Sequence, residues 1–270
     1  MEQLKYKLLS AFQAAIAGGK QILEIYNTDF EVEYKEDESP LTIADTRCND
    51  TILAELESRF PAVPVLSEEG SSLPYEERKG WKEFWLIDPL DGTKEFIKRN
   101  GEFTVNIALV EDGHPLLGVV YVPVKDIAYI GLTGEGAYKV ENASAVGPSN
   151  YNELIKNGKK MPMLRTDKTL TVVASRSHLN DETKQYIESL EEKYGTANRV
   201  SSGSSVKLCL VAEGIADVYP RFAPTMEWDT GAGDAVCRAA GCWVVDKEGK
   251  KPLRYNKEDL HNPYFLVERL

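Results

Sequence analysis

The spacing of apolar residues along this chain changes from helical repeats to short continuous runs, and then alternates between the two. Over residues 1–23 apolar residues recur every four positions, which predicts an amphipathic helix. A second helix is predicted from Thr42 to Pro61, because a proline ends the helical repeat there. After Pro61 the apolar residues form short runs separated by turn residues, as in antiparallel strands joined by hairpins. The strands predicted in this half span 63–66, 85–88, 103–110, 116–122, 126–132 and 137–140, and 71–82 is predicted to be a solvated loop.

In the second half of the chain, strands and helices alternate. The predicted strands are 170–174, 198–200, 216–219, 243–246 and 264–267, and the predicted helices are 180–194, 204–213 and 229–240. A polar segment rich in Asn and Lys, residues 141–168, separates the two patterns. We therefore expect an α+β domain over 1–142, which carries most of the candidate metal ligands, and an α/β domain over 143–270.

The net charge and the cysteines indicate which partners and which cellular compartment the protein suits. A net charge of −11 argues against a surface for nucleic acid. The four cysteines form no CxxC pair, which favours buried thiols in a reducing compartment. The sequence shows no signal-peptide pattern and no run of the roughly 20 apolar residues of a membrane span. We expect a cytoplasmic monomer or homodimer without an integral membrane segment, with peripheral attachment to the inner membrane as the alternative location.

One stretch carries the strongest chemical signal. An apolar run ends in Asp88 and is followed by Pro89, Asp91, Gly92 and Thr93. Two carboxylates three positions apart at the end of a strand suit one hard cation. The proline fixes φ in the turn, and the glycine lets the backbone approach a ligand closely. The alternative at this point is an ordinary polar turn that leaves the sheet.

Further acids occur where other predicted elements begin or end. Glu68 and Glu69 follow a predicted strand, Asp229 begins a predicted helix, and Asp45 is the third residue of a helix that Thr42 precedes. Oxygen ligands of this kind suit Mg²⁺, and three scattered histidines argue against zinc. Each acid also has a purely structural alternative, because Asp229 suits a helix N-cap and Asp45 suits a capping box.

Two segments are candidates for anion binding. Residues 201–207 are rich in serine and run into a predicted helix with Lys207 in its first turn, and a helix N-terminus with added hydroxyl groups binds anions. Arg221 follows a predicted strand, and arginine pairs well with phosphate. The alternatives are a capped serine-rich loop and a solvated arginine. Residues 229–234 resemble the anion-hole motif of ribokinase-type sugar kinases, but the spacing is one residue short and the chain has no Walker A loop, so a kinase is a weak hypothesis.

Taken together, these motifs resemble a known family. The segments similar to the signature of the inositol monophosphatase superfamily of Mg²⁺-dependent, lithium-sensitive phosphatases are 40–45, Glu68-Glu69, Asp88–Thr93 and Trp228-Asp229. Within that superfamily, 174–178, 201–207 and 219–222 resemble the CysQ branch, the 3'(2'),5'-bisphosphate nucleotidases. The resemblance covers nearly the whole chain. It implies a layered α-β-α-β-α sandwich of the inositol monophosphatase and fructose-1,6-bisphosphatase type, with the active site between the two halves.

The resemblance also implies roles for individual residues. The ligands of two or three Mg²⁺ ions would be Glu68, Asp88, the carbonyl of Leu90, Asp91 and Asp229, with Glu69 behind them. The scissile phosphate would lie against Leu90, Asp91, Gly92 and Thr93 and beside Asp229. The nucleotide would be bound by Ser175, His178, Ser202, Gly203, Lys207 and Arg221.

The implied reaction is the Mg²⁺-dependent removal of the 3'-phosphate from adenosine 3',5'-bisphosphate, which gives AMP. A further implied substrate is 3'-phosphoadenosine 5'-phosphosulfate, with sulfur assimilation as the setting. Asp45, Thr93 and Glu68 would be catalytic: Asp45 accepts a proton from Thr93, which accepts one from the attacking water. Arg221 favours a substrate with a second phosphate. The alternatives are an inositol monophosphatase or another sugar phosphatase of the superfamily, and a catalytically silent regulator that binds nucleotide and metal.

Overall fold

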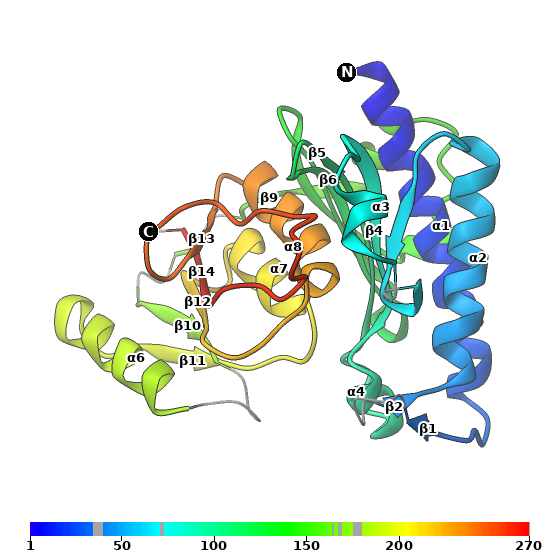
Figure 1. Ribbon diagram of the computed structural model, residues 1–270. Helices are drawn as coiled ribbons and strands as arrows, with labels where there is room; N and C mark the ends of the chain where they lie inside the picture. Colours follow the sequence, from blue (N-terminus) through cyan, green and yellow to red (C-terminus); the bar gives the residue numbers. More distant parts are fainter. Residues whose placement is uncertain (35–39, 71–72, 164, 167–168, 175–179, 270) are drawn as a thin grey trace.

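Five layers, alternately helical and β, are stacked side by side (Figure 1). The computed structural model describes residues 1–34, 40–70, 73–163, 165–166, 169–174 and 180–269. The helices of the layers are α1 (Glu2–Tyr26) and α2 (Ile43–Arg59) on one outside, α7 (Val206–Glu213) and α8 (Glu227–Ala239) between the sheets, and α6 (Asp181–Tyr194) on the other outside. The predicted α-β-α-β-α sandwich is confirmed by this arrangement.

The first sheet has seven strands in the order β3-β4-β5-β6-β7-β8-β9. Strand β3 lies parallel to β4, and the other neighbouring pairs are antiparallel. Both predicted hairpins, β5 with β6 and β7 with β8, are present. The strands are β3 (Val65–Ser67), β4 (Glu83–Asp91), β5 (Thr104–Glu111), β6 (His114–Val122), β7 (Ile127–Leu132), β8 (Gly136–Glu141) and β9 (Gly158–Met161).

The second sheet has five strands in the order β11-β10-β12-β14-β13. Strand β10 is parallel to both β11 and β12, whereas β14 is antiparallel to β12 and β13. All five strands predicted for this half of the chain are present. They are β10 (Thr171–Val173), β11 (Asn198–Val200), β12 (Val218–Arg221), β13 (Trp243–Asp246) and β14 (Phe265–Glu268).

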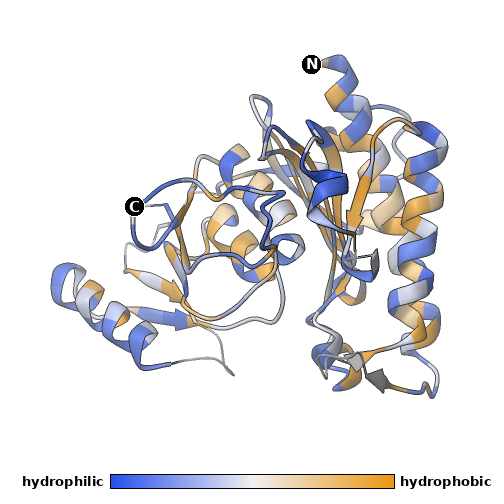
Figure 2. Ribbon diagram, in the orientation of Figure 1, coloured by the Kyte–Doolittle hydropathy of each residue, from blue (hydrophilic) through white to orange (hydrophobic). Residues whose placement is uncertain are grey.

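Both faces of the seven-stranded sheet are buried, which explains the continuous apolar run in β4. Trp85 and Ile87 pack in the core formed with α1 and α2, whereas Phe84 and Leu86 pack in the core formed with α7 and α8. Figure 2 shows the strands of this sheet as mainly hydrophobic and the outer helices α2 and α6 as largely hydrophilic. Since side chains alternate along a strand, Asp88 continues the side of Phe84 and Leu86 and is directed toward α8.

Small residues line the contact between helix α8 and the seven-stranded sheet and allow the two to pack closely. A Cβ atom at Gly118 of β6 would lie 2.2 Å from the carbonyl oxygen of Ala232 in α8. On the other side of the helix, a Cβ atom at Gly233 would lie 3.0 Å from the side chain of Leu208 in α7. The segment 229–234, which resembles a sugar-kinase motif, is therefore a buried helical segment whose small residues permit close packing.

The predicted loop over 71–82 is wrong in part. Residues Tyr75–Arg78 form a short helix, α3, and Arg78 is buried. The guanidinium of Arg78 donates to the carbonyl oxygens of Lys257 and Glu258 at 2.6 and 3.0 Å. A helix of four residues that is held by distant carbonyls has no apolar repeat that would reveal it in the sequence.

The polar segment 141–168 contributes to the first sheet. It contains helix α5 (Tyr151–Lys156) and strand β9, which pairs antiparallel with β8. Because the sheet continues past residue 142, we propose that the division between the two domains lies after Met161. The remaining short elements are β1 (Glu33–Tyr34), β2 (Pro40–Leu41), α4 (Thr93–Ile97) and the 3-10 helices η1 (Glu68–Gly70), η2 (Pro123–Lys125) and η3 (Ala143–Ala145).

The four cysteines are buried free thiols, as predicted. In the part of the chain that the structure describes, no helix combines the length and apolar character that crossing a membrane requires.

Candidate active site

A β-bulge near the end of β4 turns two aspartates toward the same side of the sheet. Asp88 pairs with Asn106 of β5 and Asp91 pairs with Thr104, so Pro89 and its successor together lie opposite a single residue of β5. On a regular strand, residues three apart would face opposite sides, and the extra residue of the bulge corrects this. A bulge also accommodates proline within a sheet.

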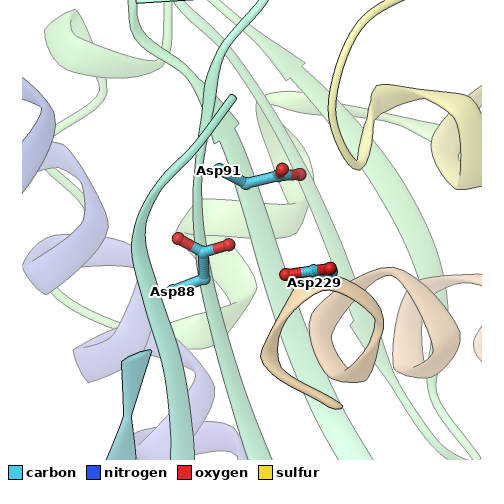
Figure 3. Close-up of side chains that lie close together, drawn as sticks. All are labelled: Asp88, Asp91 and Asp229. Atoms are coloured by element: carbon cyan, nitrogen blue, oxygen red, sulfur yellow. The ribbon is translucent and has the colours of Figure 1, made fainter. Parts of the chain in front are cut away.

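The carboxylates of Asp88, Asp91 and Asp229 converge between β4 and the first turn of α8 (Figure 3). Each offers an oxygen, and these three oxygens lie within 4.8 Å of one another. Two of the ligand candidates thus come from the first half of the chain and one from the second, which places this cluster where the halves meet.

In each of these carboxylates one oxygen is held by the protein. Asp88 accepts at Oδ1 from the backbone N–H two residues later at 3.1 Å. Asp91 accepts at Oδ2 from the N–H of Ser205 at 2.6 Å, and Asp229 accepts at Oδ2 from the N–H of Met226 at 2.9 Å. The second oxygen of Asp88 is buried and has no hydrogen-bond partner within the described residues.

The electrostatics of the cluster favour a cation. Burial, followed by the charges of Glu68, Asp91 and Asp229, raises the pKa of Asp88 well above its ordinary value. Burial, followed by the charge of Asp91, also raises the pKa of Asp229. A buried, unpartnered carboxylate oxygen among like charges is costly unless a positive ion neutralises it. The residues present therefore fit a hard divalent cation such as Mg²⁺.

The other predicted ligands lie beside this cluster. Glu68 and Glu69 form η1 directly after β3, and the charge of Glu68 acts on both Asp88 and Asp229. The carbonyl oxygen of Leu90 lies 3.4 Å from the hydroxyl oxygen of Thr93. Glu68 thus acts electrostatically on two of the aspartates, whereas the tight cluster of oxygens itself consists of the three aspartates.

Asp45 is placed for both of the roles that its sequence position allows. Its Oδ2 accepts from the N–H of Thr42 at 2.8 Å and from the Thr42 hydroxyl at 2.7 Å, which completes the capping box of α2. Its Oδ1 accepts from the hydroxyl of Thr93 at 3.3 Å. Burial raises the pKa of Asp45 to about 6, against the opposing effect of the hydrogen bonds from Thr42.

A cleft adjoins the aspartates on the side of α7. It is open to solvent, and the empty space in it, the open mouth included, is about 730 Å³. Among the residues that line it are Asp91, Gly92, Ser202, Gly203, Lys207, Arg221 and Asp229. The structure therefore brings the predicted nucleotide contacts that it describes to the edge of the aspartate cluster. Ser175 and His178, two other predicted contacts, lie outside the described residues.

The two cations of the cleft are held differently. The ammonium of Lys207 donates to the carbonyl oxygen of Ser204 at 2.7 Å, and burial lowers its pKa to about 8. Arg221 donates from Nη2 to the carbonyl oxygen of Pro224 at 3.0 Å, while its Nε is buried without a partner among the described residues. Arg221 lines the cleft, and a guanidinium in this position suits an anionic group.

Ser205 and Asn106 are polar residues of the site that the sequence did not single out. Ser205 lies inside the serine-rich segment that predicted an anion site, and Asn106 lies inside an apolar strand. The signal for Asn106 in the sequence was a polar residue inside the buried run of β5, which also contains Thr104. Its meaning depends on the pairing of Asn106 with Asp88, which the sequence does not show.

Comparison with known proteins gives a consistent result over the whole chain. The model of the inositol monophosphatase family matches residues 5–268. The 3'(2'),5'-bisphosphate nucleotidase CysQ of Salmonella typhimurium is 45% identical over 257 residues, which cover 94% of this chain and 96% of that protein. The protein of the same name from Escherichia coli K12 is 46% identical over 258 residues, with the same coverage.

Solved structures agree with the sequence comparison. The crystal structure of CysQ from Bacteroides thetaiotaomicron superposes with a TM-score of 0.90 at 50% identity, covering 98% of this chain and 97% of that one. An IMPase of Thermotoga maritima superposes with a TM-score of 0.75 at 22% identity, covering 99% and 92%, and shares the fold.

Proposed function

The chain belongs to the inositol monophosphatase family, and from that premise we propose that it is a 3'(2'),5'-bisphosphate nucleotidase. Its reaction would be the removal of the 3'-phosphate from adenosine 3',5'-bisphosphate, which gives AMP. The observation that carries the choice of substrate is one cleft that is lined both by the carboxylates of Asp91 and Asp229 and by the cations Lys207 and Arg221. A phosphate held at the metal and a second phosphate on the same small molecule would satisfy both groups.

The residues that would hold the metal are the three aspartates, with Glu68 and the Leu90 carbonyl beside them. Bound Mg²⁺ ions would supply Lewis-acid catalysis of ester hydrolysis. The chain's own residues would orient the substrate and accept a proton. Thr93 would accept a proton from the attacking water as its own hydroxyl proton passes to Oδ1 of Asp45, 3.3 Å away. Gly92 and Thr93, at the start of α4, would place their backbone N–H groups against the phosphate.

Arg221 would select for a second phosphate. It lies beside the cleft with an unpartnered buried Nε, and its planar guanidinium can bind a phosphate through two hydrogen bonds. A monophosphorylated sugar offers no second anion for it. The same proposal includes dependence on Mg²⁺ and sensitivity to lithium. It also includes 3'-phosphoadenosine 5'-phosphosulfate as a further substrate, a place in sulfur assimilation and a cytoplasmic location.

The test is release of inorganic phosphate with and without Mg²⁺ and Li⁺ across four substrates. These are adenosine 3',5'-bisphosphate, 3'-phosphoadenosine 5'-phosphosulfate, inositol monophosphate and fructose bisphosphate. We expect the highest kcat/KM on an adenosine substrate, only with Mg²⁺, and inhibition by Li⁺. A preference for a sugar phosphate would overturn the choice of substrate, and binding of nucleotide without phosphate release would indicate a silent regulator.

A further inference from the structure

Ser205 connects the two halves of the proposed metal site. It precedes α7, is almost fully buried, and its hydroxyl oxygen lies 2.6 Å from Oδ2 of Asp91 and 2.7 Å from the carbonyl oxygen of Asp229. Its N–H also donates to Oδ2 of Asp91 at 2.6 Å. Asp91 is in β4 and Asp229 is in α8, so this one side chain contacts a candidate ligand from each half.

Asn106 holds the hydroxyl of Ser205 through a hydrogen bond. It is opposite Asp88 in the register of β4 and β5, and paired residues project to the same face of a sheet. Its side-chain amide donates from Nδ2 to the hydroxyl oxygen of Ser205 at 2.9 Å. Its Oδ1 is buried and has no partner within the described chain. Leaving a buried amide oxygen unpaired is unfavourable, and such groups are rare in native proteins, so this one calls for an explanation.

The hydrogen bonds of Ser205 suit a residue that orients the neighbouring ligand candidates. A hydroxyl has one proton and can donate to Asp91 or to the Asp229 carbonyl, while it accepts from Asn106. Both Ser205 donors lie within hydrogen-bond distance of the same oxygen of Asp91, so they can fix the orientation of that carboxylate within the cluster of three aspartates. Such contacts behind a ligand fix its orientation and typically alter metal affinity by about 10–100-fold when they are removed.

We propose that Ser205 and Asn106 act as a pair of positioning residues that set the orientation of Asp91 and its distance from Asp229, and thereby the cation affinity of the site. The inference rests on the metal site of the proposed function and is independent of the nucleotide. The pair contributes no charge and no ligand atom of its own. Its effect therefore lies in geometry, which separates it from the aspartates.

The test measures Mg²⁺ binding to the whole chain by titration calorimetry without substrate, and unfolding in a chelator. Ser205→Ala removes the hydroxyl alone, and Asn106→Leu replaces the amide with an apolar group of similar size. The matched control is Ser10→Ala, which removes a buried hydroxyl that donates to the Tyr6 carbonyl in α1, on the opposite face of the sheet. We expect Ser205→Ala and Asn106→Leu each to weaken Mg²⁺ binding about 10-fold or more, with melting temperatures in chelator similar to that of the control.

The double variant decides whether the two residues act together. If Asn106 acts through Ser205, the double variant should bind Mg²⁺ about as well as Ser205→Ala, because the second change removes nothing further. Affinities of Ser205→Ala within about twofold of wild type would overturn the inference while leaving the proposed function intact. Losses that multiply in the double variant would overturn the pairing, and a wild-type chain that binds no Mg²⁺ would overturn the proposed function together with the inference.

Discussion

Thr93 donates a hydrogen bond of 3.3 Å from its hydroxyl to Oδ1 of Asp45, although the two residues lie in different elements of the first half. The other oxygen of Asp45 is occupied by the N–H and the hydroxyl of Thr42. One carboxylate thus caps α2 and faces the proposed site at the same time. The structural and the catalytic interpretations of Asp45 are therefore compatible, and kinetics can separate them.

Asp45→Asn should lower kcat by about 10²–10⁴-fold, because an amide cannot accept the proton of Thr93. The free energy of unfolding should fall by only about 1 kcal/mol, because asparagine keeps an oxygen that can accept from Thr42. Steady-state kinetics and thermal melts check the two expectations. Thr42→Ala is the matched variant: it weakens the cap and should lower kcat by less than about 10-fold. If Asp45→Asn melts earlier and turns over normally, Asp45 is only a capping residue.

Asp88→Asn should destroy activity and stabilise the metal-free protein. Turnover should fall by at least about 10³-fold, equivalent to about 4 kcal/mol. In chelator the melting temperature should rise by roughly 2–4 °C for each kcal/mol gained, because the change removes a charge that burial and its acidic neighbours disfavour. The control is Asp181→Asn on the exposed start of α6, which should alter neither quantity. Normal turnover of Asp88→Asn would remove Asp88 from the metal site.

The stability of the metal-free protein should decrease as the pH rises from about 4 to about 8. Burial raises the pKa of Asp45 to about 6 and that of Asp229 to about 8, and it raises the pKa of Asp88 as well. In this window the folded chain binds protons that the unfolded chain has released, so their contribution to stability is present below about pH 4 and is lost as these groups ionise. Melting curves in chelator across this range measure the slope. Saturating Mg²⁺ should flatten it, and an equal slope with and without Mg²⁺ would contradict the proposed site.

Arg221→Glu should discriminate between substrates. Replacing a cation beside the cleft with an anion should reduce kcat/KM for adenosine 3',5'-bisphosphate by about 10²-fold or more, with a smaller loss on inositol monophosphate, which has no second phosphate. Arg199→Glu, on β11 and away from the cleft, controls for the change in net charge. Equal losses on both substrates would show that Arg221 does not recognise the second phosphate.

The sequence predicted the layers well because most of their elements are long or strongly patterned. The buried run of β4, the repeat in α1 and the capping box of α2 each depend on residues close together in the chain. The three aspartates were also recognisable, since each lies at an end of an element. Features of the fold that depend on local patterns can therefore be predicted from the sequence.

The features that local patterns missed depend on pairing between distant segments. The bulge that aligns Asp88 with Asp91 is defined by its register with β5, and the contacts of Ser205 depend on how α7 is placed beside β4. Helix α3 is short and is held by Arg78 against the carbonyl of Lys257. None of these relationships leaves a repeat or a spacing in the sequence.

Gly118→Ala tests whether close packing of α8 sustains the site. A methyl group at this position would lie 2.2 Å from the carbonyl oxygen of Ala232, so helix and sheet must separate. Overpacking of this kind typically costs about 1–3 kcal/mol, which corresponds to a fall of several degrees in melting temperature. Because α8 carries Asp229, the displacement should also weaken Mg²⁺ binding, as calorimetry would show. The control is Gly80→Ala, where nothing lies within 4 Å of the added atom, and it should leave the melting temperature and the Mg²⁺ affinity unchanged. If Gly118→Ala is destabilised but binds Mg²⁺ as the wild type does, the position of Asp229 does not depend on this contact.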